Sequence, residues 1–381
     1  MQLKDFDVGL FLLDYWQQKP LLIRNPWKDW TNPLDPDELA GLACESDVES
    51  RLILRGEGGW SLEYGPLAET RFRRLGPKRW TLLVQAVDHH VPEVAALIEP
   101  FRFIPDWRID DVMVSYAADE GGVGPHFDQY DVFLIQGLGR RRWRVGAVCG
   151  EEARLLPHDD LRLLDHFDPV DEWVLDPGDI LYLPPRFAHN GVAVGGDCMT
   201  YSVGFRAPSR RELIAAWCDD VLAGLRGGDR YADPGLPLQD NPGEISEEAL
   251  TRLHAMITDR LLDREAFARA FGKHSSARRY PEVDWEPDEP IGIGELRAWA
   301  ADGTALCRNP ASRFSFISRA PDAIWLFADG ECFECRGDAA TMARTLCAED
   351  RVDVGPGLTD AALATICALY NQGSITLDAE D

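Results

Sequence analysis

The sequence predicts a mainly β protein with added α-helix, in which an antiparallel barrel or double-sheet jelly roll precedes a helical module and a small mixed domain. Short apolar runs separated by turn residues recur between residues 110 and 206, a spacing typical of such barrels. Apolar residues at helical spacing follow between residues 210 and 271. The 381-residue chain is also longer than one domain usually is, which favours two or three domains.

The predicted barrel strands are short and are bounded by Gly, Pro or Asp residues, which favour turns. We expect these strands at residues 112–116, 130–136, 142–145, 180–183 and 200–205. In the first third of the chain, a helix is predicted to begin at Pro36 and to reach residue 43. A further strand is predicted over 50–55, before the glycine-rich turn at 56–59.

Two amphipathic segments are predicted after Pro208. Residues 210–225 and 246–271 both place apolar side chains near the 3.6-residue period of an α-helix. The stretch 280–290 is rich in proline and acidic residues and is predicted to be a linker. We therefore expect domains at 1–208, 209–278 and 279–381.

The charge balance limits the classes of partner. With 65 acidic and 39 basic residues, the net charge of -26 repels nucleic acid and anionic membranes and attracts basic proteins, although acidity also serves solubility alone. No apolar stretch approaches the roughly 18 residues of a membrane helix, and no basic leader is present. Nine cysteines, an odd number, indicate reduced thiols. We expect a cytoplasmic protein with a basic protein partner.

Three His-x-Asp pairs are candidates for metal binding, and they begin at His126, His158 and His166. Residues i and i+2 of a strand point to the same face, so both side chains of a pair could reach one ion. His158 and His166 lie in an acidic stretch that is predicted to be a solvated insertion. His126 and Asp128 instead lead into an apolar strand of the predicted barrel, where metal ligands are expected.

A third ligand is expected from a neighbouring strand. His189 follows a turn-strand-turn unit that ends at Pro184 and Pro185, so we place it at the start of the next strand, 191–194. Two imidazoles and one carboxylate leave three coordination positions open, as in the 2-His-1-carboxylate triad of non-haem iron(II) oxygenases. The sequence thus predicts a catalytic metal site, although zinc, nickel or cobalt would use the same ligands.

The motifs around these residues resemble the bacterial ribosomal oxygenases of the jumonji class. The resemblance covers residues 97–208, with motifs at 105–111, 121–133, 139–143, 177–182 and 201–208, and extends to 15–20 and 82–87. It implies a cupin/jumonji double-stranded β-helix barrel, an α-helical dimerisation module that forms a homodimer, and a winged-helix-like C-terminal domain. It also implies an iron(II)-dependent arginine hydroxylase of large-subunit ribosomal protein sixteen. Such an enzyme consumes 2-oxoglutarate and molecular oxygen and releases succinate and carbon dioxide.

The resemblance also implies roles for individual residues. His126, Asp128 and His189 match the iron ligands, and Arg141 matches the residue that binds the distal carboxylate of 2-oxoglutarate. A guanidinium suits this role because it pairs bidentately with a carboxylate. Ser115 matches a position that assists the co-substrate, although its hydroxyl could equally be structural. Ala117 departs from the pattern, because a second serine is expected there.

Other interpretations remain open. A cupin-type metal-dependent dioxygenase or isomerase that does not use 2-oxoglutarate would need the same triad. Cys332 and Cys335 form a Cys-x-x-Cys pair, but no second pair or histidine lies at finger spacing, which does not favour zinc or redox chemistry. The acidic C-terminal region lacks a basic recognition stretch, so no direct nucleic-acid binding is expected. The two amphipathic segments offer more apolar surface than one helix pair can bury, which favours a homodimer.

Overall fold

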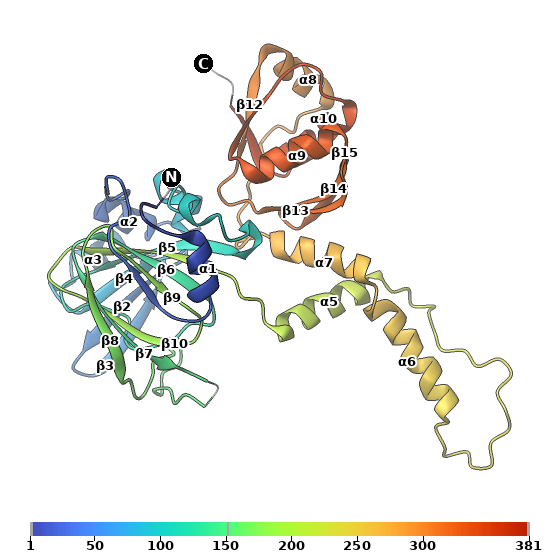
Figure 1. Cartoon of the computed structure of the whole chain (residues 1–381), viewed down its shortest axis with the longest axis horizontal. Coiled ribbons are helices and arrows are strands. Elements are labelled where there is room, and N and C mark those ends of the chain that lie inside the picture. Colours follow the sequence, from blue (N-terminus) through green and yellow to red (C-terminus); the bar gives the residue numbers. More distant parts are fainter. Residues whose placement is uncertain (1–2, 151, 379–381) are drawn as a thin grey trace. The chain divides into compact units, whose positions relative to one another are not determined.

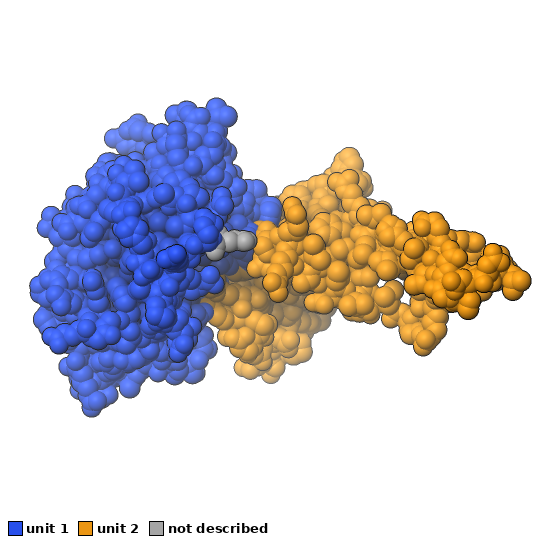
Figure 2. Space-filling model, turned by 90° about the horizontal axis from the view of Figure 1, so that it is seen from below, with its two compact units in different colours: residues 1–207 blue, residues 208–381 orange. Residues whose placement is uncertain are grey.

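The computed structural model describes residues 3–150 and 152–378 (Figure 1). The chain divides into two compact units, residues 1–207 and 208–381 (Figure 2). Unit 1 contains the predicted barrel, and unit 2 contains the helical segments and a small α+β domain. Among the described residues, no helix is long and apolar enough to span a membrane. A further division of unit 2 at residue 278 stays a prediction.

Unit 1 is built on two antiparallel sheets. In its described part, the larger sheet has the order β1-β9-β6-β11-β5-β4-β2-β3 and the smaller has the order β10-β7-β8. Their strands are β1 (Leu21–Ile23), β2 (Ser50–Gly56), β3 (Gly59–Tyr64), β4 (Trp80–Val84), β5 (Ile109–Ala117), β6 (Asp131–Leu138), β7 (Arg141–Val148), β8 (Pro169–Leu175), β9 (Ile180–Leu183), β10 (Phe187–Ala193) and β11 (Cys198–Phe205). The five predicted barrel strands correspond to β5, β6, β7, β9 and β11, so the double-sheet architecture is confirmed.

Both faces of the larger sheet are covered, as the alternation along β6 demonstrates. Phe133 and Ile135 belong to the main apolar core on the outer face. Val132 and Leu134 pack with Trp143 of the smaller sheet, on the inner face. Successive strand residues point to opposite faces, so a strand covered on both sides is apolar throughout. The inner face, between the two sheets, is where the candidate site lies.

Short helices accompany the larger sheet of unit 1. They are α1 (Val8–Asp14), α2 (Pro36–Leu42), α3 (Glu69–Phe72) and α4 (Pro92–Ala95), with single 3-10 turns η1 (Val87–His89), η2 (Glu99–Phe101) and η3 (Asp106–Arg108). The predicted helix at Pro36 is α2. It begins there because Asp35 accepts a hydrogen bond from the backbone N–H of Asp37 while Glu38 accepts one from Asp35. Phe11 of α1 and Leu39 of α2 are fully buried in the core.

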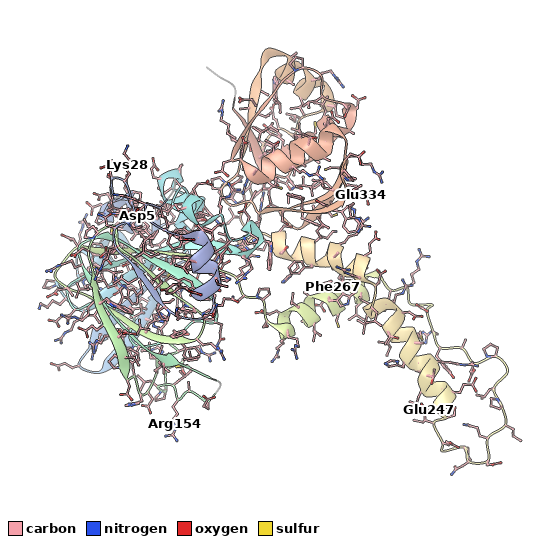
Figure 3. All side chains as sticks on the ribbon, in the orientation of Figure 1. Asp5, Lys28, Arg154, Glu247, Phe267 and Glu334 are labelled. Carbon is pink, nitrogen blue, oxygen red and sulfur yellow. The ribbon has the colours of Figure 1, made fainter. Side chains whose placement is uncertain are left out.

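Unit 2 begins with three helices, α5 (Arg210–Gly224), α6 (Glu247–Leu261) and α7 (Arg264–Ser276). The continuous helical segment predicted over 246–271 is wrong. The helix breaks because Asp263 adopts an extended backbone and its side chain accepts hydrogen bonds from the N–H groups of Glu265 and Ala266, which caps a new helix. Trp217 of α5 packs edge-on against Phe267 of α7, with ring centroids 5.7 Å apart. Figure 3 labels Phe267, at the place where α5 and α7 lie side by side.

The rest of unit 2 is a small α+β domain whose described strands form two antiparallel sheets, β16-β12-β17 and β13-β14-β15. Its elements are α8 (Ile293–Asp302), β12 (Thr304–Arg308), β13 (Phe314–Ala320), β14 (Ala323–Ala328), β15 (Glu331–Arg336), α9 (Asp338–Ala348), β16 (Arg351–Val354), α10 (Asp360–Asn371) and β17 (Ile375–Asp378). Helix α7 packs on β14, where Gly272 lies so close to Phe327 that a Cβ would come within 2.3 Å of its ring. The predicted linker 280–290 contains neither helix nor strand.

Candidate active site

The three predicted metal ligands meet on the inner face of unit 1. His189 lies within β10, two residues after its start, instead of at the start of a strand over 191–194 as predicted. His126 pairs with it in an isolated antiparallel bridge, in which each backbone N–H donates to the other carbonyl at 3.0 and 2.8 Å. The carbonyl of Asp128 accepts a hydrogen bond from the N–H of Arg186 at 2.6 Å. Backbone pairing therefore brings together ligands that are far apart in the sequence.

The ligand atoms are arranged to share one ion. One atom each of His126, Asp128 and His189 lies within 4.8 Å of the others. The two Nε2 atoms are 3.8 and 3.5 Å from Asp128 Oδ2. Each Nδ1 lies 2.9 Å from a backbone carbonyl, that of Gly124 or Phe187. An Nδ1–H that donates there leaves Nε2 with a free lone pair, the form that binds a metal. The donor set fits a divalent cation with open positions.

Burial favours the neutral form of one imidazole. His189 is 3% exposed, and its pKa is lowered to about 4, first by burial and then by the neighbouring His126. A neutral imidazole at neutral pH is the form that metal ligation requires. His126 and Asp128 are only partly buried. One ligand is therefore held deep in the barrel while two lie nearer to solvent.

Arg141 is the first residue of β7, and its side chain lies on the same inner face as the metal ligands. It is 3% exposed, and its Nη2 is 3.4 Å from the hydroxyl oxygen of Ser115 on β5. Its Nε has no hydrogen-bond partner among the described residues. A neutral hydroxyl does not balance a guanidinium charge, and a buried charge without a counter-ion is unfavourable. The structure thus brings together Arg141 and Ser115, the two residues that the resemblance assigns to the co-substrate, in a place that fits an anionic ligand.

Trp143, two residues further along β7, lies between Arg141 and the metal ligands. Its ring centroid is 5.7 Å from the guanidinium carbon of Arg141 and 5.9 Å from the ring centroid of His189. Gly191 is its register partner on β10, and a Cβ there would come within 2.6 Å of the indole. A glycine at 191 is therefore needed to seat this ring. The indole is therefore close to both the guanidinium and His189, and its Nε1 has no hydrogen-bond partner among the described residues.

In the other two His-x-Asp pairs, Asp160, His166 and Asp168 are exposed as predicted, whereas His158 is partly buried. His158 Nδ1 accepts hydrogen bonds from the backbone N–H groups of Asp160 and Leu161. His166 Nε2 lies 2.8 Å from Asp168, and both side chains are at least 80% exposed. Neither pair approaches a third ligand within the described part of the chain, where the triad alone meets the geometric requirements of a metal cluster.

The acidic insertion lies beside the triad, a position that was not predicted from the sequence. The N–H of Leu164 donates to the carbonyl of Pro125 at 2.8 Å, next to His126. The Leu163 side chain packs against Gly124, where a Cβ would come within 3.0 Å of it. The insertion and the start of β8 carry exposed or partly exposed carboxylates at Asp159, Asp160, Asp165, Asp168, Asp171 and Glu172. One edge of the candidate site is therefore acidic.

The Cys-x-x-Cys pair is not a ligand pair. Cys335 is buried in the apolar core of unit 2. Burial raises the pKa of the Cys332 thiol, and the charge of Arg269 on α7 offsets only part of this rise. Residues three apart on a strand point to opposite faces, so the two thiols do not converge.

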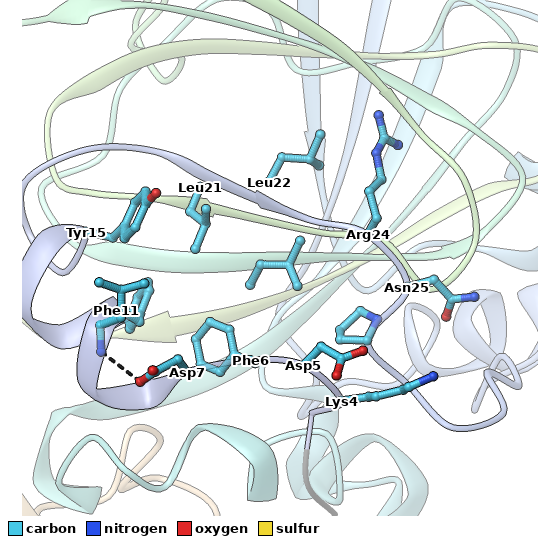
Figure 4. Close-up of a pocket in the computed structure, with 13 residues that line it drawn as sticks. Lys4, Asp5, Phe6, Asp7, Phe11, Tyr15, Leu21, Leu22, Arg24 and Asn25 are labelled. Carbon is cyan, nitrogen blue, oxygen red and sulfur yellow. Dashed lines mark hydrogen bonds between the residues drawn. The ribbon is translucent and has the colours of Figure 1, made fainter.

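A separate cavity of about 560 Å³ lies between the N-terminal segment, α1 and β1 (Figure 4). Its apolar lining includes Phe6, Phe11 and Leu21, with Lys4 and Arg24 among its charged residues. None of the candidate site residues lines it. The cavity is distinct from the metal site.

Comparisons with known proteins agree with this architecture. A family model for the JmjC domain matches residues 96–213, and one for the ROXA-like winged helix matches residues 255–376. The predicted cupin/jumonji barrel and winged-helix-like domain are thus confirmed. The second match begins within α6, so the winged-helix model also includes α7.

Whole-chain relatives extend the match. The chain is 41% identical over 369 residues to the ribosomal protein uL16 3-hydroxylase of Escherichia coli (strain K12), with 95% of each covered. It is similar to the crystal structure of E. coli YcfD, with a TM-score of 0.87, 37% identity and coverage of 99% and 100%. A structure of the ribosomal oxygenase YcfD in complex with cobalt and 2-oxoglutarate gives a TM-score of 0.85 at 37% identity, with 99% of both chains covered. The chain therefore belongs to the family of JmjC-type ribosomal oxygenases.

Proposed function

We propose that this chain is an iron(II)- and 2-oxoglutarate-dependent oxygenase that hydroxylates a large-subunit ribosomal protein. The main observation is the placement of a 2-His-1-carboxylate set and a buried arginine without a counter-ion on one inner face, with the Trp143 ring close to both Arg141 and His189. A dianionic keto acid has one end for a metal and one for a guanidinium. The names of a uL16 hydroxylase relative and of a related complex with cobalt and 2-oxoglutarate support this proposal.

In this proposal, His126, Asp128 and His189 hold the iron, and Arg141 pairs with the distal carboxylate of 2-oxoglutarate. Iron(II) bound there supplies the activation of molecular oxygen, and 2-oxoglutarate is converted to succinate and carbon dioxide. The Ser115 hydroxyl is a further donor for the co-substrate. The protein's own task is to orient the keto acid, to hold each imidazole through Nδ1 so that Nε2 faces the metal, and to exclude water with apolar side chains.

We infer that the target side chain is an arginine. The acidic insertion beside His126 offers carboxylates to a basic protein segment, and carboxylates pair well with guanidinium groups. The net charge of -26 also attracts a basic ribosomal protein over longer distances. An enzyme with this substrate acts in the cytoplasm, where ribosomal proteins are made.

The test is to incubate the protein with iron(II), 2-oxoglutarate and isolated ribosomal proteins, and to analyse the products by mass spectrometry. We expect one added oxygen atom on an arginine of the uL16 protein, together with succinate. Oxidation that does not require 2-oxoglutarate would favour the alternative of a metal-dependent dioxygenase, and the absence of both oxidation and succinate would favour an isomerase. An added oxygen on another residue type would refute the arginine assignment while leaving the oxygenase in place.

We also propose that the chain forms a homodimer through its helical segments. Every residue of α5 and α6 is at least partly exposed. Leu222, Ile257 and Leu262 are 64%, 58% and 79% exposed. Exposed apolar surface of this extent favours a protein partner, and a second copy of the chain offers a self-complementary one.

A further inference from the structure

A buried hydroxyl without a partner lies on the inner face of unit 1. Thr81 in β4 is 0% exposed, and its Oγ1 has no hydrogen-bond partner in residues 3–150 and 152–378. Buried hydroxyls are nearly always paired, because an unpaired one loses its hydration without compensation. The metal ligands and Arg141 do not use this group. Its position suggests what it binds.

Strand register places Thr81 beside the candidate co-substrate site. Thr81 pairs with Ala117 across β4 and β5, and Leu83 pairs with Ser115 in the same ladder. Leu82, between them, belongs to the core on the outer face. Because side chains alternate along a strand, Thr81 faces the inner side together with Ala117 and Ser115. Directly paired Cβ atoms lie about 5 Å apart, within reach of one bound carboxylate.

Ala117 is the position at which this chain lacks a hydroxyl. Its methyl group forms a small buried cluster with Ala193 and Cys198, and Ala193 is the register partner of Arg141. This cluster provides no strong hydrogen-bond donor next to the guanidinium. The Ser115 hydroxyl makes two contacts of 3.4 Å each, which are long for hydrogen bonds. A carboxylate at Arg141 would therefore have room for further donors, and the described residues offer the unpaired Thr81 Oγ1 and Trp143 Nε1 there.

We propose that Thr81 binds the co-substrate: its Oγ1 donates a hydrogen bond to the carboxylate of 2-oxoglutarate that Arg141 holds. Thr81 thereby supplies, from the neighbouring strand, the hydroxyl that Ala117 does not provide. This inference rests on the proposed function, because it takes 2-oxoglutarate to be the ligand of Arg141. The pocket would then have a hydroxyl donor on β4 in addition to Ser115 on β5. A bound carboxylate would also explain why the Thr81 hydroxyl is buried without a partner.

The binding test is calorimetric titration of 2-oxoglutarate into the full-length zinc-loaded protein, which binds without turnover because zinc has no redox chemistry. Thr81→Val removes the hydroxyl and keeps a β-branched side chain. We expect it to raise the Kd about tenfold, the effect of one hydrogen bond to a charged group. Thr81→Ser should bind almost as the wild type does. Ala117→Ser, added to Thr81→Val, should restore most of the affinity, whereas an unchanged Kd for Thr81→Val would overturn the inference.

Thermal unfolding of the ligand-free protein separates binding from a structural role. Thr81→Val removes an unpaired hydroxyl, so the melting temperature should stay the same or rise. Thr200→Val is a matched control, because Thr200 Oγ1 donates to Gln136 Oε1 at 3.3 Å and the substitution leaves that oxygen unpaired. Its melting temperature should fall. A comparable fall for Thr81→Val would show that its hydroxyl is structural and would overturn the inference.

Arg141→Ala and a shorter keto acid distinguish this inference from the proposed function. If Arg141→Ala loses affinity for 2-oxoglutarate but Thr81→Val does not, the inference fails and the proposed function stands. If neither variant loses affinity, both fail. Pyruvate lacks the distal carboxylate, so its Kd should be the same in the wild type and in Thr81→Val. An equal loss for both keto acids would contradict a contact with the distal carboxylate.

Discussion

The inner barrel strand β11 and the helices α5 and α6 differ in how they bury apolar side chains. All eight residues of β11 are buried, because the strand lies within a sheet that is covered on both faces. Every residue of α5 and α6 is at least partly exposed, including apolar ones. The barrel satisfies its apolar groups within one chain. The helices instead leave several apolar side chains exposed.

What each region leaves unsatisfied indicates what it binds. The barrel leaves several buried polar atoms without partners among the described residues, and those near the candidate site, which include Arg141 Nε, Trp143 Nε1 and Thr81 Oγ1, favour a small anionic ligand. The helices leave apolar side chains exposed, and these favour a protein surface. The two regions therefore differ in the kind of group that they leave unsatisfied, and substitutions should separate them.

The largest expected effect is on the metal triad. His189→Ala should lower 2-oxoglutarate turnover by more than about 100-fold, since even the groups that support a metal ligand contribute 10-fold to 100-fold. The fold should persist, as measured by far-UV circular dichroism. His166→Ala is the matched control, because this exposed His-x-Asp histidine should keep wild-type succinate formation. Wild-type turnover in His189→Ala would sink the triad assignment.

The next effect concerns the anion end of the pocket. Arg141→Ala should raise the KM for 2-oxoglutarate about 100-fold, as expected for the loss of a bidentate charged pair, and should change the metal affinity little. Arg142→Ala is the control, because Arg142 is exposed and lies 3.4 Å from Glu172. If Arg142→Ala or Arg140→Ala has the larger effect, the residue that faces the co-substrate has been misassigned by one position.

Local patterns predicted the barrel strands well and the helix boundaries of unit 2 poorly. The predicted strand 180–183 coincides with β9, because turn residues and apolar runs are local signals. The break at Asp263 was missed because apolar residues continue through Leu261 and Leu262. The available signal was Asp263 itself, because aspartate often caps the N-terminus of a helix.

The candidate site shows the same limit. His126 and His189 could be selected by motif and by resemblance, but their pairing depends on a backbone bridge between distant segments. Nothing in Trp80–Val84 marks Thr81, because a threonine is ordinary in a strand. Its significance comes from its register with Ala117 and from its unpaired, buried hydroxyl, which only three-dimensional structure provides.

A smaller effect is expected for the helical surface. Ile257→Arg places a charge on an exposed apolar position of α6, so it should weaken a homodimer by at least about tenfold. Light scattering at micromolar concentration should show a dimeric mass for the wild type and a lower mass for the variant. Arg252→Ala is the control, since Arg252 forms an ion pair with Glu248 of its own helix and should leave the mass unchanged. A monomeric wild type would refute the dimer. A fully dimeric variant would place the interface elsewhere.

The smallest effect concerns the acidic edge of the site. Asp165 is exposed, and the insertion that carries it is held beside His126 by the Leu164–Pro125 hydrogen bond. Asp165→Lys should therefore raise the KM for a basic ribosomal protein about threefold to tenfold at low salt. The KM for 2-oxoglutarate should not change, because this charge does not contact the keto acid. Asp240→Lys alters the net charge equally from an exposed loop of unit 2 and is the control. Because exposed charges are screened, the difference between the two variants should vanish at high salt; a difference that persists there would mean that Asp165 acts by direct contact.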